Sequence, residues 1–244
     1  MTPARPVALA LLAAFGLAAP PPQAAKVDLA LVLAVDVSES VDAEEYTLQH
    51  EGIARAFEAP PLVEAIGGGR NGAIDVLVME WSDRDKQVVT VDWTRVSDAA
   101  SAGDFAARVR ASQRSSSGLT AIGDALAAAE RVLARAPDQA ARRVIDVSGD
   151  GIANIGPPPK QIRDRLVAQG ITINGLAILK HEPWLDGYYD QNVVGGEGGF
   201  LMQVEDFPSF VAAMQQKLLN EVLAARPIRR AALACPQRLR CSRS

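Results

Sequence analysis

The sequence predicts an α/β fold: a doubly wound, mostly parallel sheet of six strands with helices on both faces. Apolar runs alternate along the chain with segments in which apolar residues recur at helical spacing, which is typical of strand–helix–strand units. Two of the runs, 73–81 and 87–93, are joined by only five residues. Because that connection is too short for a crossover helix, we expect these runs to pair as an antiparallel hairpin. The sheet should therefore carry one antiparallel edge strand.

The first strand is expected at 29–35, where the continuous apolar run LALVLAV is typical of a strand buried on both faces. A helix should follow over 42–57 and end before Pro60 and Pro61, because proline cannot continue it. The apolar stripe of this helix consists of Tyr46, His50, Ile53 and Phe57. The glycines at 67–69 are expected to form the loop that leads into the hairpin.

The second half of the chain continues the alternation of helices and strands. Helices are expected at 102–113, 121–136 and 160–169, and strands at 143–147, 171–179 and 200–204. A last helix should begin after Asp206, a good N-cap residue, and bury a stripe that runs from Phe207 to Val222. The segment 182–199 is rich in glycine and aromatic residues, and we expect it to be a loop.

The composition indicates one globular domain, which we place at 26–225. Hydrophobic residues make up 48% of the chain and charged residues 22%, which is too apolar for a disordered protein. The segment 226–244 holds six arginines and no acidic residue, so the domain itself is more acidic than the net charge of −4 implies. An acidic domain argues against a nucleic-acid-binding surface.

Residues 1–25 have the pattern of a secretory signal peptide. Arg5 precedes an uncharged apolar stretch of 13 residues, and small residues follow up to Ala25. This stretch is shorter than the roughly 20 residues that a membrane-spanning helix needs. We therefore expect cleavage near Ala25, a periplasmic or secreted bacterial protein, and no stable membrane span afterwards. An uncleaved membrane anchor is the alternative.

The basic tail, 226–244, contains both cysteines of the chain, Cys235 and Cys241. In an oxidising compartment they would close a small disulfide loop. Alternatively, the tail is a dispensable segment, partly disordered, in which the cysteines have no structural role.

Three segments rich in oxygen donors stand at strand ends or directly before a helix. Asp36, Ser38 and Ser40 follow the first strand, Thr120 precedes a helix, and Asp150 follows the strand at 143–147. Because the carboxyl ends of parallel strands meet at one edge of a sheet, we expect these side chains to converge. An oxygen-only set suits Mg²⁺, Mn²⁺ or Ca²⁺ and excludes a zinc-type site built from Cys or His.

These motifs make the chain resemble a von Willebrand factor type A (VWA) domain over about 27–225. The segments Asp-x-Ser-x-Ser, the later threonine and the Asp-Gly pair resemble its metal-ion-dependent adhesion site, which implies the ligands Asp36, Ser38, Ser40, Thr120 and Asp150. In that family the hydroxyls usually bind the metal directly, and the aspartates bind it directly or through water. The resemblance implies Mg²⁺ first, and a binding module that captures a carboxylate of a protein partner. The strings LVLAVDVSES, EWS, RRVIDVSGDGIANIG and GITINGLAIL resemble an exported bacterial branch, the domain-of-unknown-function family 1194.

The chain departs from the family at Glu39, a position that is usually glycine. Its carboxylate would either add charge beside the metal or point to solvent, and we favour solvent because every other ligand type is in place. Glu39 is also a candidate for the rim that meets a ligand, together with Trp184, Tyr188 and Tyr189. These aromatic residues would either anchor a partner or fold back over the edge of the sheet.

Competing interpretations of the motifs are weaker. An EF-hand that begins at Asp36 fails, because Val41 occupies the position that needs glycine and Thr47 the position that needs a bidentate glutamate. Asp146 lies inside a predicted strand, so we expect it to support the ligands from behind or to be a structural carboxylate, rather than to bind the metal. His50 lies on an apolar helical stripe, and His181 begins a loop without a nucleophile motif.

No recognised catalytic motif occurs in the sequence. It lacks a Gly-x-Ser-x-Gly elbow, a Gly-Lys-Ser/Thr phosphate loop and a His-Glu-x-x-His zinc motif. We therefore expect a metal-dependent binding protein rather than an enzyme. The alternatives are a metal-assisted hydrolase, for which Glu39 is the one candidate general base, and a metal that only stabilises the fold.

Overall fold

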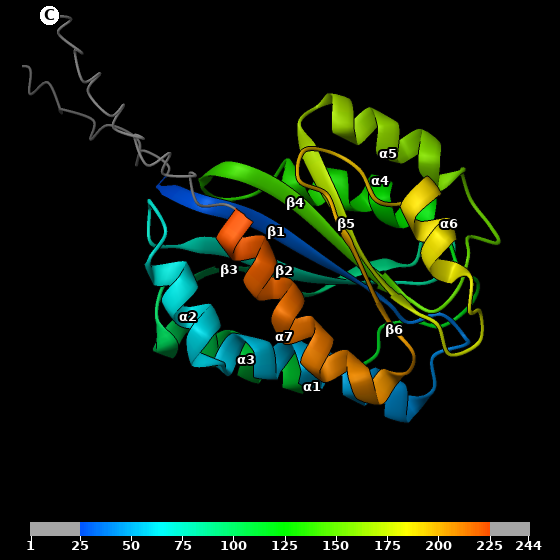
Figure 1. The fold of residues 1–244 in the computed structure, drawn as a ribbon, viewed down its shortest axis with the longest axis horizontal. Helices are drawn as coiled ribbons and strands as arrows, with labels where there is room; N and C mark the ends of the chain where they lie inside the picture. Colours follow the sequence, from blue (N-terminus) through cyan, green and yellow to red (C-terminus); the bar gives the residue numbers. More distant parts are fainter. Residues whose placement is uncertain (1–24, 225–244) are drawn as a thin grey trace, which may run out of the picture.

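β1 (Lys26–Asp36) lies in the middle of the sheet, and every residue after Lys26 in this strand is buried. The computed structural model describes residues 25–224 (Figure 1). In sheet order the strands are β3 (Gln87–Val96), β2 (Ile74–Trp81), β1, β4 (Gln139–Gly149), β5 (Ile171–Ile178) and β6 (Leu201–Val204). All neighbours pair in parallel except β2 and β3, which are antiparallel. The predicted sheet and its antiparallel edge strand are therefore confirmed.

Helices cover both faces of this sheet (Figure 1). One face carries α1 (Ala43–Glu58), α2 (Pro60–Gly67), α3 (Ala99–Ala111) and α7 (Phe207–Ala224), and the other carries α4 (Ile122–Leu133), α5 (Pro159–Ala168) and α6 (Leu185–Asn192). Because side chains alternate along a strand, Leu29, Leu31 and Leu33 of β1 pack against the first group. The smaller Ala30, Val32 and Ala34 pack against the second group. Among residues 25–224, no helix is both long and apolar enough to cross a membrane.

Two helices were missing from the prediction. Pro60 does end the first helical segment, because α1 stops at Glu58 and Ala59 is extended. The same proline then begins α2, since its fixed φ suits the first turn of a helix and it has no N–H to leave unpaired. α6 lies inside the segment that we expected to be a loop, 182–199. It is only eight residues long, and it is held by the burial of Leu185 and Tyr189 against the sheet.

Asp75, the second residue of β2, is a buried carboxylate at the end of the sheet where the parallel strands begin. It lies opposite Arg95 in the register of β2 and β3, but the guanidinium of Arg95 pairs with Asp138 at 2.6 Å instead. In the part of the chain that the structure describes, no side chain donates a hydrogen bond to either carboxylate oxygen of Asp75. Burial, together with the negative charge of Asp138, raises the pKa of Asp75 to about 6. Since the folded state holds this proton more tightly than the unfolded state, the free energy of unfolding falls as the pH rises from about 4 to about 6.

We expect Asp75→Asn to raise the free energy of unfolding at pH 7 by about 1–3 kcal/mol, because each unit of pKa shift is worth about 1.4 kcal/mol. At pH 4 the gain should nearly vanish, since the folded protein then holds the proton. Urea denaturation of wild type and variant at both pH values would measure this. Asp104→Asn, an exposed site on α3, is the control and should change neither value. A gain that is the same at pH 4 and pH 7 would contradict the prediction.

Candidate metal centre

The first and third of the oxygen-rich segments meet because β1 and β4 are parallel neighbours. Asp36 is the last residue of β1, and Asp150 directly follows Gly149, the last residue of β4. The backbone N–H of Ser38 donates to Oδ1 of Asp36 at 2.8 Å, and the hydroxyls of Ser38 and Ser40 lie 3.1 Å apart. The Ser40 hydroxyl donates to Oδ1 of Asp150 at 2.7 Å. Hydrogen bonds thus connect four of the five predicted ligands.

Thr120, the fifth, is buried just before α4 and is tied to the segment that follows Asp150. Its N–H donates to Oδ1 of Asn154 at 2.9 Å, and its carbonyl accepts the Asn154 N–H at 3.1 Å. The Thr120 hydroxyl lies 3.9 Å from the place where a Cβ on Gly151 would stand. The N–H of Glu39 donates to the Gly118 carbonyl at 2.8 Å, which joins the first segment to the second. All five predicted ligands therefore lie at one edge of the sheet.

Among residues 25–224, neither carboxylate of this cluster forms an ion pair with a basic side chain. Asp36 is fully buried, and burial, followed by the negative charge of Asp150, raises its pKa to about 7. Burial also raises the pKa of Asp150. Within residues 25–224, the second oxygen, Oδ2, of each carboxylate is buried and accepts no hydrogen bond of ordinary geometry. Buried carboxylate oxygens without a donor are costly unless a cation compensates them.

Tyr189 contributes a third buried oxygen without a partner. A Cβ built on Gly149 would lie 2.5 Å from the Tyr189 hydroxyl oxygen and 2.8 Å from Oδ2 of Asp36, so these two oxygens converge over Gly149. Among the described residues, no group of three or more His, Cys, Asp or Glu side chains could hold a metal. Two carboxylates supplemented by hydroxyls are instead a donor set for a hard divalent cation, and the residues present fit such an ion.

The comparison with known families agrees with this geometry. A family model described as "Protein of unknown function (DUF1194)" matches residues 26–226. The chain belongs to this family. No curated protein matches the DUF1194 chain.

Solved structures similar to this DUF1194 protein show that its fold is that of a VWA domain. Proximal thread matrix protein 1 from the mussel byssus, in a form with a zinc-occupied MIDAS motif, has a TM-score of 0.55 and 18% identity over 82% of this chain and 49% of that one. A von Willebrand factor type A protein from Catenulispora acidiphila has a TM-score of 0.55 and 15% identity, over 81% and 43%. The vWF domain of the pilus tip protein Mfa5 from Porphyromonas gingivalis has a TM-score of 0.55 and 10% identity, over 82% and 97%. The DUF1194 chain thus covers about half of the mussel protein.

The rim candidates of the DUF1194 protein lie in three different environments. Glu39 and Trp184 are exposed, and Trp184 keeps 55% of its surface accessible. Tyr188 is half-buried, and its hydroxyl accepts the N–H of Ala153 at 3.3 Å. Tyr189 is completely buried beneath the cluster because α6 turns it toward the sheet, so it follows the second of the two expected alternatives and folds back rather than facing a partner. Glu39 has a negative φ, so its backbone has no need of the usual glycine.

Two of the remaining candidates lie away from the cluster: Asp146 forms an ion pair with Lys217 on the face covered by α7, and His50 is buried beside Glu80. His181 is exposed, and its charge acts on Asp150 in the direction that lowers the pKa of that carboxyl. Cys235 and Cys241, like the expected signal peptide, lie outside the described residues, so those predictions stay predictions.

Three residues that support the cluster were not predicted: Asn154, Gln49 and Arg114. Gln49 donates to the carbonyl of Asp36 at 3.0 Å, and Arg114 donates to the carbonyls of Val37 and Ser38, each at 2.8 Å. The one signal available in the sequence was Gln49, a polar residue adjacent to the apolar stripe of α1. Arg114 stands in a polar segment with no periodicity, so nothing local marked it.

Proposed function

We propose that this protein is an exported binding module that holds a divalent cation and uses it to capture a carboxylate of a protein partner. The ligands would be Asp36, Ser38, Ser40, Thr120 and Asp150. The observation that carries the proposal is the convergence of these side chains around two buried carboxylate oxygens for which residues 25–224 provide no hydrogen-bond donor of ordinary geometry. The cation would neutralise the carboxylates, and the cluster reaches the surface at Ser40, which is exposed.

Mg²⁺ is the cation that we propose first, with Mn²⁺ and Ca²⁺ as alternatives. All of the donors are hard oxygens, and only two of them come from carboxylates. Two negative charges and neutral hydroxyls would leave the ion electrophilic enough to accept a further carboxylate. The mussel protein with zinc in its MIDAS motif makes zinc a useful fourth ion to test.

Exposed apolar side chains next to the cluster support a protein partner. Leu119, which directly precedes Thr120, is 44% exposed, and Trp184, which directly precedes α6, is 55% exposed. Large apolar side chains of this kind often contribute the contacts around the centre of a protein interface. The acidic character of the domain gives no support to a nucleic-acid partner.

We propose binding rather than catalysis as the use of the metal. A hydrolase would need a general base held in place beside the ion. The candidate for that role, Glu39, has an exposed side chain, and none of the residues 25–224 forms a hydrogen bond or an ion pair with its carboxylate. Export is proposed from the signal-like pattern of 1–25.

We expect Asp36→Ala to lower the affinity for Mg²⁺ by at least 100-fold, because it removes a ligand of the proposed site. Isothermal titration of the full chain with Mg²⁺, Mn²⁺, Ca²⁺ and Zn²⁺ would measure this. Glu39→Gln is the matched control: it removes a neighbouring carboxylate that points to solvent, and it should keep the wild-type affinity. Equal affinities of wild type and Asp36→Ala would refute the site.

The partner is tested by pull-down from a periplasmic extract with wild type and Asp36→Ala, each with and without EDTA. If the protein is an adhesion module, a partner protein should be retained by wild type without EDTA. It should be lost from wild type with EDTA and from Asp36→Ala under both conditions. Metal-dependent turnover of ester substrates without a retained protein would favour the hydrolase instead.

A further inference from the structure

Three successive backbone carbonyls of the first metal segment are held by side chains from elsewhere in the chain. Gln49 of α1 donates to the carbonyl of Asp36 at 3.0 Å. Arg114, in the segment between α3 and α4, donates to the carbonyls of both Val37 and Ser38 at 2.8 Å. These hydrogen bonds hold the backbone of residues 36–38 in place. The side chains of Asp36, Ser38 and Ser40 remain as the donors for the proposed cation.

Arg114 is itself held in place. Its Nε donates to the carbonyl of Ser116 at 3.0 Å, and the hydroxyl of Ser116 lies 2.9 Å from that of Ser82, which directly follows β2. The N–H of Ser115 donates to Oε2 of Glu80, a fully buried residue of β2, at 2.7 Å. The two residues that directly follow Arg114 therefore attach its segment to β2 and to the residue after it.

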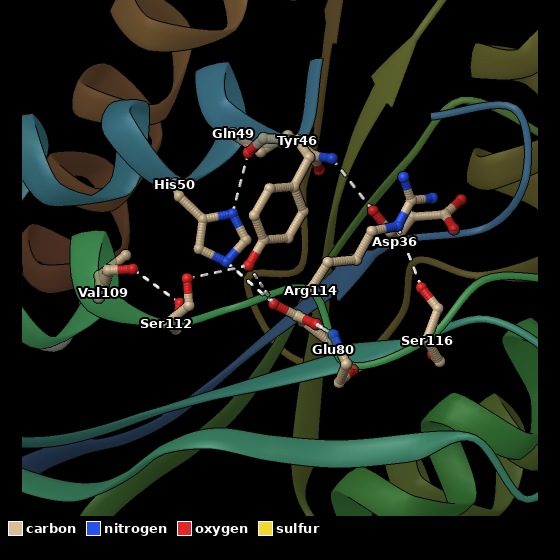
Figure 2. Close-up of polar contacts among 10 residues, drawn as sticks. Asp36, Tyr46, Gln49, His50, Glu80, Val109, Ser112, Arg114 and Ser116 are labelled. Carbon is tan, nitrogen blue, oxygen red and sulfur yellow. Dashed lines mark hydrogen bonds and ion pairs between the residues drawn. The ribbon is translucent and has the colours of Figure 1, made fainter. Parts of the chain in front are cut away.

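Glu80 also attaches this segment to α1. Its Oε1 accepts the hydroxyl of Tyr46 at 2.9 Å and lies 3.1 Å from Nε2 of His50 (Figure 2). Burial disfavours the charge of Glu80, but the hydrogen bonds from His50 and Ser115 outweigh burial and lower its pKa below the ordinary value. The same helix carries Gln49, so Glu80 joins the segment that contains Arg114 to the helix that contains Gln49.

We infer that Arg114 is a positioning residue of the metal centre, and that Gln49 assists it. The two side chains hold the segment 36–40 in the conformation that presents Asp36, Ser38 and Ser40, and the network around Glu80 holds Arg114. This inference rests on the proposed function. Residues that orient metal ligands without touching the metal typically change its affinity by 10–100-fold when they are replaced.

The test compares Mg²⁺ and Mn²⁺ affinity, by isothermal titration of the full chain, with the urea midpoint of the metal-free protein. We expect Arg114→Gln to weaken both affinities by 10–100-fold, in a protein that remains folded at the titration temperature. Arg114→Lys should recover part of the loss, because an ammonium group can reach one of the two carbonyls. Arg108→Gln, an exposed arginine of α3, is the control and should change neither quantity.

Gln49→Met provides a second test if Arg114→Gln does not fold. It keeps the volume of the side chain and removes only the donor to the Asp36 carbonyl, and it should weaken metal binding several-fold. If wild type binds metal and the folded variants Arg114→Lys and Gln49→Met bind it equally well, the inference is overturned and these residues serve stability alone. If wild type binds neither ion, it is the proposed function that fails.

Discussion

Lys217→Met should lower the free energy of unfolding by about 3–5 kcal/mol, the usual cost of breaking a buried ion pair on one side. Lys217 of α7 is fully buried, and its ammonium group pairs with Asp146 of β4 and, at 2.6 Å, with Glu221 one turn further along the helix. Burial, followed by the charge of Glu221, already raises the pKa of Asp146 to about 7. Without the lysine, two carboxylates would remain in the interior with no opposite charge between them.

Lys160→Met is a matched control, because Lys160 pairs with Asp164 at the same spacing along α5 but at an exposed site. Its loss should cost less than about 0.5 kcal/mol. The triple variant Lys217→Met, Asp146→Asn, Glu221→Gln should recover part of the lost stability, since it removes the uncompensated charges as well. Urea denaturation at pH 7 measures all three. Similar losses at Lys217 and Lys160 would show that the buried cluster contributes no more than a surface pair.

Gly149→Ala is expected to lower the affinity for Mg²⁺ at least tenfold and to destabilise the metal-free protein by about 1–3 kcal/mol. The added methyl group would lie 2.5 Å from the Tyr189 hydroxyl and 2.8 Å from Oδ2 of Asp36, closer than real Cβ contacts allow. Both neighbours are fully buried, so the new carbon would displace the oxygens that face the proposed ion.

Gly103→Ala separates this effect from the general effect of adding a methyl group. Gly103 lies within α3 and has open space around it, so alanine there should leave metal binding unchanged and stabilise the helix by about 0.5–1 kcal/mol. Isothermal titration and urea denaturation of both variants would check the pair. Wild-type metal affinity in Gly149→Ala would mean that cation binding does not depend on the position of the Asp36 carboxylate over Gly149.

The predicted ligands could be located from the chain because each stands at a place that local sequence defines. Asp36 and Asp150 directly follow buried strands, and Thr120 precedes a helix. The alternation of strands and helices then brings such positions to one edge, whatever the details of packing. The same reasoning left open whether Tyr189 anchors a partner or folds back over the sheet, because a periodicity of two buried residues, Leu185 and Tyr189, is too short to distinguish a helix from a loop.

The sequence alone was sufficient to predict the α/β class, the antiparallel edge strand and the convergence of five oxygen-bearing residues. Strand periodicity and the short hairpin connection constrain each of these features locally. Tertiary structure alone decided which side chains support the cluster. Arg114 meets Val37 across 77 positions of the chain, and Gln49, Glu80 and Lys217 find their partners only when helices pack on the sheet. Polar residues buried in this way carry no period of their own. Their positions are set by the need of a buried hydrogen-bonding group or charge for a partner, wherever in the chain that partner lies.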